Sequence, residues 1–286
     1  MRSGNSYLWW ALAVLAGAGL LPAALYFFLL SPRVAKLTPP FRPVAHFYEN
    51  PKISLNQIRL KVFYVVPRNK TVLPDWQTPI QSALKDAVRF HTLEFQGSSV
   101  LNYDIFPEPV VLTEDNLAYD TTSTNRGNPY ALLRISDELG WRAFRADGDL
   151  YTPNFLAGEP NEYQVLGIVY EGVGDAGSAI YESDLSSASE IAKQLGVPES
   201  AVAVVHLEKV NGFFLLNRDF LTNEKYRSYG ATLMYHEFAH TLGLPDGYDV
   251  LTNAVWTSDI MGGGRYDPIG TAYLDQKSLH GLGILP

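Results

Sequence analysis

Hydrophobic and polar positions along the chain repeat with the two-residue period of a strand in some segments and with the period of a helix in others. These segments alternate, so strands and helices are predicted one after the other. Residues 58–66 (IRLKVFYVV) alternate and then become wholly apolar, as is typical of a buried strand. Residues 76–95 instead place Ile80, Leu84 and Val88 at helical spacing. A strand followed by a helix therefore opens the globular part of the chain.

The same patterns continue towards the C-terminus. Strands are predicted at 100–112, with a proline break, and at 163–171, 201–210 and 212–220, and helices at 131–145 and 229–243. This alternation predicts an α/β fold whose twisted, mostly parallel sheet has packed helices and an edge strand, and a small C-terminal subdomain follows the last long helix.

The first 57 residues have a different pattern. Residues 7–30 form a run of 24 residues without a charge, with aromatic residues at both ends, and such a run is long enough to cross a hydrocarbon core of roughly 30 Å. We interpret this run as an uncleaved transmembrane anchor, because a cleaved signal peptide usually has a shorter apolar region and a small-residue cleavage site. Residues 31–57 hold five prolines and are predicted to be a linker. The expected domains are thus 1–30, 31–57 and 58–286.

The membrane side of the body stays open. Arg33, Lys36 and Arg42 follow the apolar run, and a count of positive charges would keep the body in the cytoplasm. Large domains are translocated against a weak bias, however, and we expect a membrane-anchored body on the extracytoplasmic side. Nothing in the pattern predicts an oligomeric state.

The amino-acid composition argues against several classes of function. The net charge is −8 without a cluster of Lys and Arg, which argues against nucleic acid as a partner. The chain has no cysteine, so thiolate metal sites and a cysteine nucleophile are excluded. Any metal must be held by His, Asp or Glu.

The stretch HEFAHTLGLPDGYD carries the candidate chemistry. On a helix, His236 and His240 lie on one face, one turn apart, so both imidazoles can point at one ion. Glu237 lies alongside and can reach a water bound to that ion. A surface helix with two histidines is the alternative interpretation of this spacing.

The residues after the second histidine favour the metal site. Gly243 and Pro245 stop the helix, so the chain can turn back and present Asp246 as a third ligand. Three protein ligands and one open position are typical of catalytic zinc. Further on, SDIMGGGRYDP places Met261 in a glycine-rich turn, where it can form a hydrophobic floor under the metal.

HExxHxxGxxD followed by a methionine turn resembles the metzincin metallopeptidases, in the branch whose third ligand is Asp. The stretch 236–285 is most similar to the immune inhibitor A-like peptidases and secondly, through HTLGLPD, to the snapalysin-like enzymes. The resemblance implies that His236, His240 and Asp246 bind one Zn²⁺ and that Glu237 is the catalytic base. It also implies a metzincin-like fold and Met261 as the Met-turn residue. Ala239 stands where that family usually has glycine, and no propeptide of the usual size is recognised.

These residues predict a zinc endopeptidase acting on a protein or peptide substrate. Zinc would lower the pKa of its water, and Glu237 would pass that proton to the leaving amine. Tyr266 is the first candidate for stabilising the oxyanion and Tyr248 the second, whereas Asp249 is interpreted as a turn residue. An extended substrate would pair with an edge strand, either AVAVVHL or GFFLL.

Three alternatives stay open. The first is a catalytically silent metalloprotease-like binding or scaffold module on the same anchor, although a binding module would have no need of a base beside the metal. The second is calcium at Asp147 and Asp149, against which a solvated turn is the simpler interpretation. The third is dinucleotide binding at GIVYEGVGDAG, which requires a helix to begin at the glycines, whereas the following residues are polar and turn-like.

Overall fold

The structure is a computed structural model, and it describes residues 55–120, 129–144, 146–156, 162–174, 176–180, 210–249 and 252–283. All of them belong to the second of two units into which the chain divides, residues 44–286. The predicted anchor at 7–30, almost all of the predicted linker and the predicted strand at 201–210 apart from Val210 lie outside the described residues. Among the described residues, no helix has both the length and the apolar character needed to cross a membrane.

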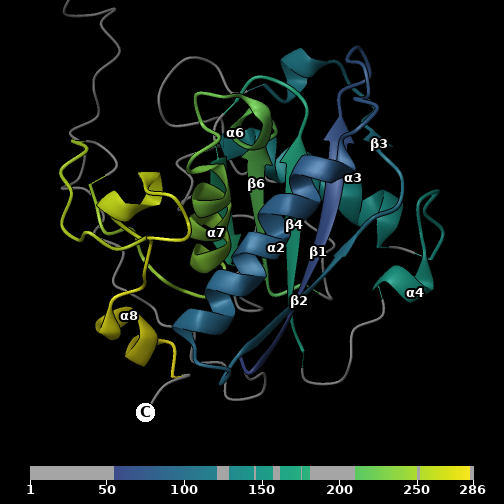
Figure 1. The fold of residues 1–286 in the computed structure, drawn as a ribbon. Helices are drawn as coiled ribbons and strands as arrows, with labels where there is room; N and C mark the ends of the chain where they lie inside the picture. The colour runs from purple at the N-terminus through teal and green to yellow at the C-terminus, as the bar shows by residue number, and fades with distance from the viewer. Residues whose placement is uncertain are drawn as a thin grey trace, which may run out of the picture. The chain divides into compact units, whose positions relative to one another are not determined.

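A six-stranded sheet organises the described residues (Figure 1). Its strands are β1 (Gln57–Val66), β2 (Val100–Ile105), β3 (Val110–Val111), β4 (Tyr163–Tyr170), β5 (Ala176–Ile180) and β6 (Gly212–Asn217). The order is β2-β1-β4-β6-β5, and β3 pairs with the far end of β1. All pairings are parallel except that of β5 with β6, which is antiparallel. The expectation of a mostly parallel sheet in an α/β fold is confirmed.

Helices cover both faces of this sheet. The described helices are α2 (Gln77–Glu94), α3 (Pro129–Ala143), α4 (Pro153–Leu156), α6 (Asp219–Thr222), α7 (Gly230–His240) and α8 (Gln276–Gly281), with short 3-10 turns η1 (Asn116–Ala118) and η3 (Gly263–Tyr266). Helices α2 and α7 lie side by side on one face (Figure 1).

Strand β1 shows why the sheet has two apolar faces. Ile58, Leu60 and Tyr64 point into a core shared with α2 and α7, whereas Phe63 and Val65 point into a second core that includes residues of α3. Successive side chains of a strand alternate between faces, so a strand buried on both sides shows an almost unbroken apolar run. The run over residues 58–66 is explained by this double burial.

Two expectations about strands are wrong. The stretch GFFLL lies in β6, which is held between β4 and β5, so it cannot be the free edge of the sheet. Residues Ala176–Ile180, which include the last glycine of GIVYEGVGDAG and the first three residues after it, form strand β5 instead of a turn, whereas the rest of the stretch expected to be turn-like lies outside the described residues. Small residues have weak strand propensity, and here the strand is defined by its pairing with β6. Because the last of these glycines lies within a strand and no helix begins in the described residues 172–174 and 176–180, the geometry needed for dinucleotide binding is absent from this described segment.

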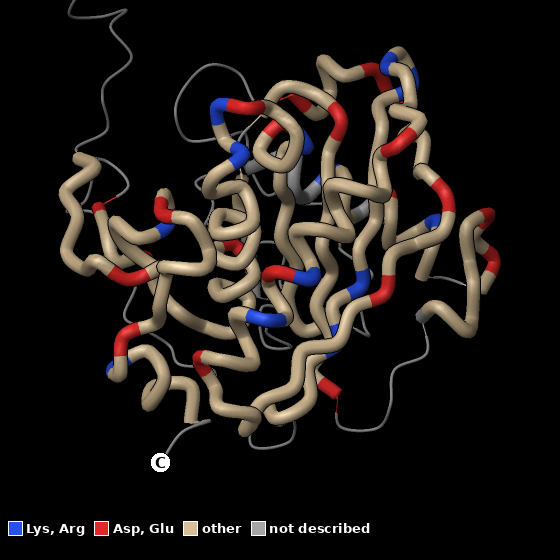
Figure 2. The backbone as a smooth tube through the Cα atoms, in the orientation of Figure 1, with Lys and Arg blue, Asp and Glu red and all other residues tan. Residues whose placement is uncertain are grey.

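Charged residues are spread over this fold. Figure 2 shows Lys and Arg scattered among Asp and Glu along the described backbone. Several of them are paired across the sheet, as Arg59 is with Glu162 at 3.0 Å and Arg218 with Glu171 at 2.8 Å.

Candidate metal centre

Helix α7 positions the two candidate histidine ligands. It is buried almost all round, and Met234 and Phe238 are each 2% exposed in the core between α7, α2 and the sheet. His236 and His240 are one turn apart, and their ring centroids lie 4.5 Å from each other. The packing of the apolar side chains therefore fixes the direction in which both imidazoles point.

The helix ends at His240, three residues earlier than the predicted boundary. Gly243 then adopts a φ of 99°, a left-handed conformation that glycine enters without a steric penalty. Its N–H donates to the carbonyl of His240 at 2.9 Å, and the N–H of Leu244 donates to Ala239 at 3.3 Å. The chain reverses at this turn, which brings Asp246 back towards the helix.

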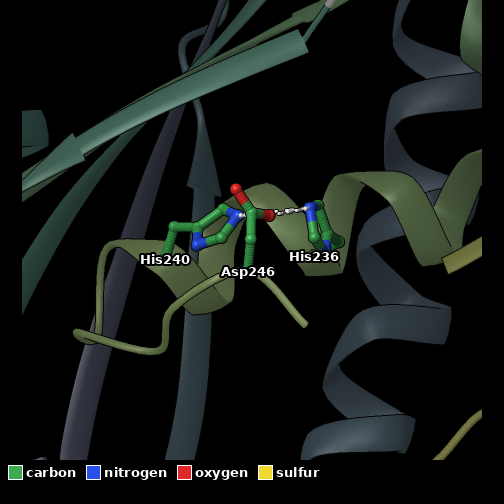
Figure 3. A group of neighbouring side chains, drawn as sticks. All are labelled: His236, His240 and Asp246. Carbon is green, nitrogen blue, oxygen red and sulfur yellow. Dashed lines mark hydrogen bonds and ion pairs between the residues drawn. The ribbon is translucent and has the colours of Figure 1, made fainter. Parts of the chain in front are cut away.

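Three ligand atoms converge after this reversal (Figure 3). The Nε2 atoms of His236 and His240 are 3.1 Å apart. Asp246 Oδ1 lies 3.5 Å from the first and 3.1 Å from the second. Among the described residues, these three form the group of His, Asp and Glu side chains that could hold a metal ion.

The second nitrogen of each imidazole is committed to a backbone carbonyl. His236 Nδ1 lies 2.9 Å from Ile260 O, and His240 Nδ1 lies 2.7 Å from Leu244 O. A carbonyl can only accept, so each Nδ1 carries a hydrogen, and in a neutral imidazole Nε2 then presents a lone pair to the centre. This arrangement of a donated N–H behind the ligand atom is the one found at metal-binding histidines.

The electrostatics of the group favour a positive charge between the three side chains. Burial alone would lower the pKa of His240, but its contact with Asp246 and the charge of Glu237 raise it to about 9. Burial would raise the pKa of Asp246, yet the two histidines hold it well below its usual range. The carboxylate therefore stays ionised and attracts a cation.

The residues present fit a zinc ion. Asp246 Oδ1 is buried, and within the described part of the chain it has no hydrogen-bond partner. When both imidazoles are neutral, the two Nε2 atoms and Asp246 Oδ1 present their electron pairs to one point, where a metal ion can accept them. Two nitrogens and one oxygen are also a donor set that suits zinc.

Glu237 and Met261 both lie beside this group. Glu237 is 8% exposed, and its charge contributes to raising the pKa of His240. Met261 is 2% exposed and directly follows Ile260, whose carbonyl holds His236. The glycine-rich turn predicted around Met261 thus packs against the first histidine through its backbone.

The two candidate tyrosines occupy different environments. Tyr266 is 54% exposed, and its ring lies edge-on to Tyr229 with the centroids 5.5 Å apart. Tyr248 has its ring centroid 6.0 Å from that of His236. Burial raises the pKa of Tyr248, and the charge of Asp246 adds to this rise. The structure thus brings the second candidate, Tyr248, to the metal-binding group.

The remaining sequence candidates have other contacts. Asp249 Oδ1 accepts from the N–H of Thr252 at 2.9 Å, which places Asp249 in a turn. Asp149 pairs with Arg142 at 2.8 Å, so a cation at this acidic turn would compete with an arginine. His91 is fully buried between Tyr235 and Ser99, away from solvent. Sequence reasoning had not identified Arg265, whose guanidinium carbon lies 3.6 Å from the ring centroid of Tyr248.

Comparison with known proteins leaves the family open. No family model matches the chain, and no curated protein matches it. Catalytically inactive OgpA from Akkermansia muciniphila, in complex with an O-glycopeptide (glycodrosocin) substrate, is similar over 79% of this chain and 59% of its own length, with 13% identity and a TM-score of 0.37. Metalloproteinase-II from Bacteroides fragilis is similar over 86% and 57%, with 12% identity and a TM-score of 0.39. The chain thus spans less than two thirds of the length of each of these structures.

Proposed function

We propose that this protein is a zinc-dependent endopeptidase of metzincin type, with its centre at His236, His240 and Asp246. The observation that carries the proposal is the convergence of two histidine Nε2 atoms and one carboxylate oxygen, separated by 3.1 to 3.5 Å. Structural zinc sites use four protein ligands, whereas catalytic sites use three and keep one position open. The HExxHxxGxxD pattern and the methionine turn support the same interpretation.

Glu237 is the proposed general base. His236, His240 and Asp246 would hold the zinc, which would supply an acidified water and Lewis-acid polarisation of the scissile carbonyl. The Glu237 carboxylate would accept a proton from the water that attacks the scissile carbonyl and would return it to the nitrogen that leaves when the C–N bond breaks, as a positioned carboxylate does in general acid–base catalysis. Its place next to His236 on α7 and its electrostatic effect on His240 are consistent with this role.

The outermost strand of the sheet, as far as the chain is described, offers a place for the peptide. Strand β5 is the last strand of the order β2-β1-β4-β6-β5 among the described residues, and α7 packs against it. Extended peptides add to the outer strand of a sheet through backbone hydrogen bonds, a mode of binding that suits unstructured protein segments. We therefore propose that β5, in place of the GFFLL segment, receives the substrate.

Digestion of an unstructured protein such as casein by the purified full-length chain tests the proposal. We expect cleavage that a chelator abolishes and added zinc restores, and we expect Glu237→Ala to lose cleavage while it still holds zinc. Glu224→Gln, which changes an exposed glutamate, is the matched control and should cleave like the wild type. A wild type that binds zinc and cleaves nothing would support the scaffold module instead.

A membrane anchor at residues 7–30 is part of the proposal, with the body on the extracytoplasmic side. The uncharged run of 24 residues supports it. External protease applied to intact cells should remove the body and leave a membrane-bound stub. A body that is cleaved only after cell lysis would contradict the extracytoplasmic location.

A further inference from the structure

Strand β2 lies at the end of the strand order opposite to β5, and β1 is its neighbour on one side (Figure 1). The N–H groups of Val100 and Phe106 donate to the carbonyls of Asn56 and Val62 at 2.9 and 2.8 Å, which fixes the edge of β2 that faces β1. Backbone groups of successive residues in a strand point to opposite edges. The alternate residues between these two therefore direct their backbone groups away from β1.

These alternate residues are Leu101, Tyr103 and Ile105. Across the described ranges, β1 is the strand that pairs with β2, and no hydrogen bond to the N–H or C=O groups of these three residues is present. A row of unpaired donors and acceptors at the edge of a sheet is a template for one more extended chain. At roughly 3.3 Å per residue, β2 offers about 20 Å of such an edge.

A pocket of about 630 Å³ lies at this edge, with Tyr103 of β2 in its lining. Gln77 and Gln81 of α2 line the same pocket, and α2 contributes to the core on one face of the sheet. Phe155 of α4 also lines it and packs against the core on the other face. Because its walls come from both faces, the pocket extends around the edge of β2, where the backbone groups are unpaired.

Asp104 supplies the charge among the described lining residues of this pocket. Its side chain is 41% exposed, and its Oδ2 lies 3.4 Å from Arg59 and 3.7 Å from Lys61. Arg59 is closer to Glu162, at 3.0 Å, so it neutralises Asp104 only in part. No partner of Asp104 Oδ1 is present in the part of the chain that the structure describes. A carboxylate oxygen in this state accepts from a cationic donor, and charge-assisted hydrogen bonds of this kind are strong.

We propose that the edge of β2 and this pocket bind an extended basic peptide from another protein: its backbone pairs with Leu101, Tyr103 and Ile105, and one lysine or arginine side chain reaches Asp104. Strand addition of this kind takes its affinity from the backbone and its specificity from pockets for alternate side chains. The surface is separate from the metal centre and does not depend on the proposed activity.

The charge of the chain favours a basic peptide over a second copy as the occupant. Each copy carries a net charge of −8 and would present the same carboxylate at the same edge. Like charges close to each other across paired strands are destabilising, whereas opposite charges attract. A basic peptide therefore complements both the unpaired backbone and the charge of the pocket.

Fluorescence polarisation with labelled peptides tests the backbone pairing. The probe is a peptide of roughly eight residues, long enough to cover β2, with alternating valine and threonine and one central lysine. It is added to the full-length Glu237→Ala chain, so that it is not cleaved. Two further peptides carry N-methyl groups on alternate residues. An added strand directs every second N–H to its neighbour, so one of them should bind like the parent and the other at least about tenfold more weakly. Equal affinities of the two methylated peptides would contradict strand addition.

Substitutions in the pocket test where the peptide binds. Asp104→Asn should weaken binding about threefold, the effect of one cross-strand charge pair, and Gln81→Glu, at an exposed lining residue, should strengthen it by a similar factor. Asp86→Asn, at an exposed aspartate of α2 outside the lining, is the matched control and should leave the affinity unchanged. If Asp104→Asn fails to fold, as judged by circular dichroism, Gln81→Glu decides alone.

Three results would overturn the proposal. The first is a parent peptide that does not bind. The second is an affinity that neither Asp104→Asn nor Gln81→Glu changes, which would place the peptide elsewhere. The third is a dimer of the full-length chain that dissociates in Tyr103→Pro, since proline removes one of the outward N–H groups, and this would assign the edge to a second copy. None of these readouts requires zinc or cleavage, so failure here is distinguishable from failure of the proposed peptidase.

Discussion

The N–H of Gly247 donates to the carbonyl of Met261 at 2.6 Å, and this bond joins the segment of the third candidate ligand to the glycine-rich turn. The carbonyl of Gly247 in turn accepts from Trp256 at 2.7 Å. Because Asp246 directly precedes Gly247, the position of its carboxylate depends on this turn as well as on α7. One turn thus supports both His236, through Ile260, and Asp246.

Replacement of Gly247 should disturb the centre. A Cβ at this position would lie 2.0 Å from Thr257 Oγ1, which is held by Asp259 at 2.6 Å, and 3.0 Å from Gly262 Cα. We expect Gly247→Ala to lower the free energy of unfolding by about 1–3 kcal/mol, the usual cost of overpacking, and to weaken zinc binding. Urea unfolding of the zinc-free chain and a zinc titration measure the two effects.

Gly270→Ala is the matched control for this variant. A Cβ at Gly270 meets no atom within 4 Å, and its φ is not in the left-handed region. Its stability and zinc affinity should therefore equal those of the wild type. Equal behaviour of Gly247→Ala and Gly270→Ala would show that the close packing at Gly247 does not shape the centre.

The two aspartates after the helix should respond differently to the same substitution. Asp246→Asn keeps the shape of the side chain and removes its negative charge, so zinc affinity should fall by more than the roughly 10–100-fold typical of an outer-shell change. Asp249→Asn should keep zinc affinity, because Asp249 accepts from Thr252 in a turn. Zinc titrations of both variants measure the two affinities. A larger loss of affinity for Asp249→Asn than for Asp246→Asn would show that Asp249, and not Asp246, is the third ligand.

His91 should make the stability of the fold depend on pH. Ser99 Oγ donates to Leu55 O at 2.6 Å, so it accepts from His91 Nε2 at 2.8 Å, and His91 Nδ1 accepts from Tyr235 at 2.7 Å. Burial lowers the pKa of His91 to about 3, compared with 6.5 for an ordinary histidine. The folded state thus holds neutral His91, and the unfolded state binds the proton first as the pH falls.

Neutral His91 therefore stabilises the folded state more at high pH than at low pH. The contribution of His91 is fully present above pH 6.5 and is lost progressively as the pH falls towards 3. Between pH 7 and pH 5, the wild type should lose about 2 kcal/mol more unfolding free energy than His91→Gln. Urea unfolding of both proteins at the two pH values measures the difference. Parallel loss in both proteins would mean that His91 titrates alike when folded and unfolded.

Much of the sheet and of the main helices could be predicted from periodicity alone. Strand β1 is buried on both faces, which gives its unbroken apolar run. Helix α2 is buried on one face, which gives apolar residues at helical spacing. Strand β5 could not be predicted, because Ala176–Ile180 is rich in small residues and is a strand through its pairing with β6. Helix α7 ends three residues before the boundary predicted from the sequence, because Gly243 is the left-handed residue beyond the helix and does not belong to its last turn.

The candidate metal centre, too, could be predicted from the sequence only in part. The spacing of His236 and His240 on one helix face follows from the period of the helix, and the return of Asp246 follows from Gly243 and Pro245. The carbonyls of Ile260 and Leu244 that orient the imidazoles leave no trace in the sequence, because every residue has a carbonyl. The contact between Arg265 and Tyr248 joins residues far apart in the chain, and only the fold brings them together.

Zinc content of the purified full-length chain tests the central claim most directly. Elemental analysis after dialysis should find about one zinc per chain in the wild type, because a catalytic centre with three protein ligands binds a single ion. Substitution of both histidines, His236→Ala with His240→Ala, should remove it. A wild type without zinc, or a double variant that retains the full amount, would contradict the assignment of His236, His240 and Asp246 as the metal centre.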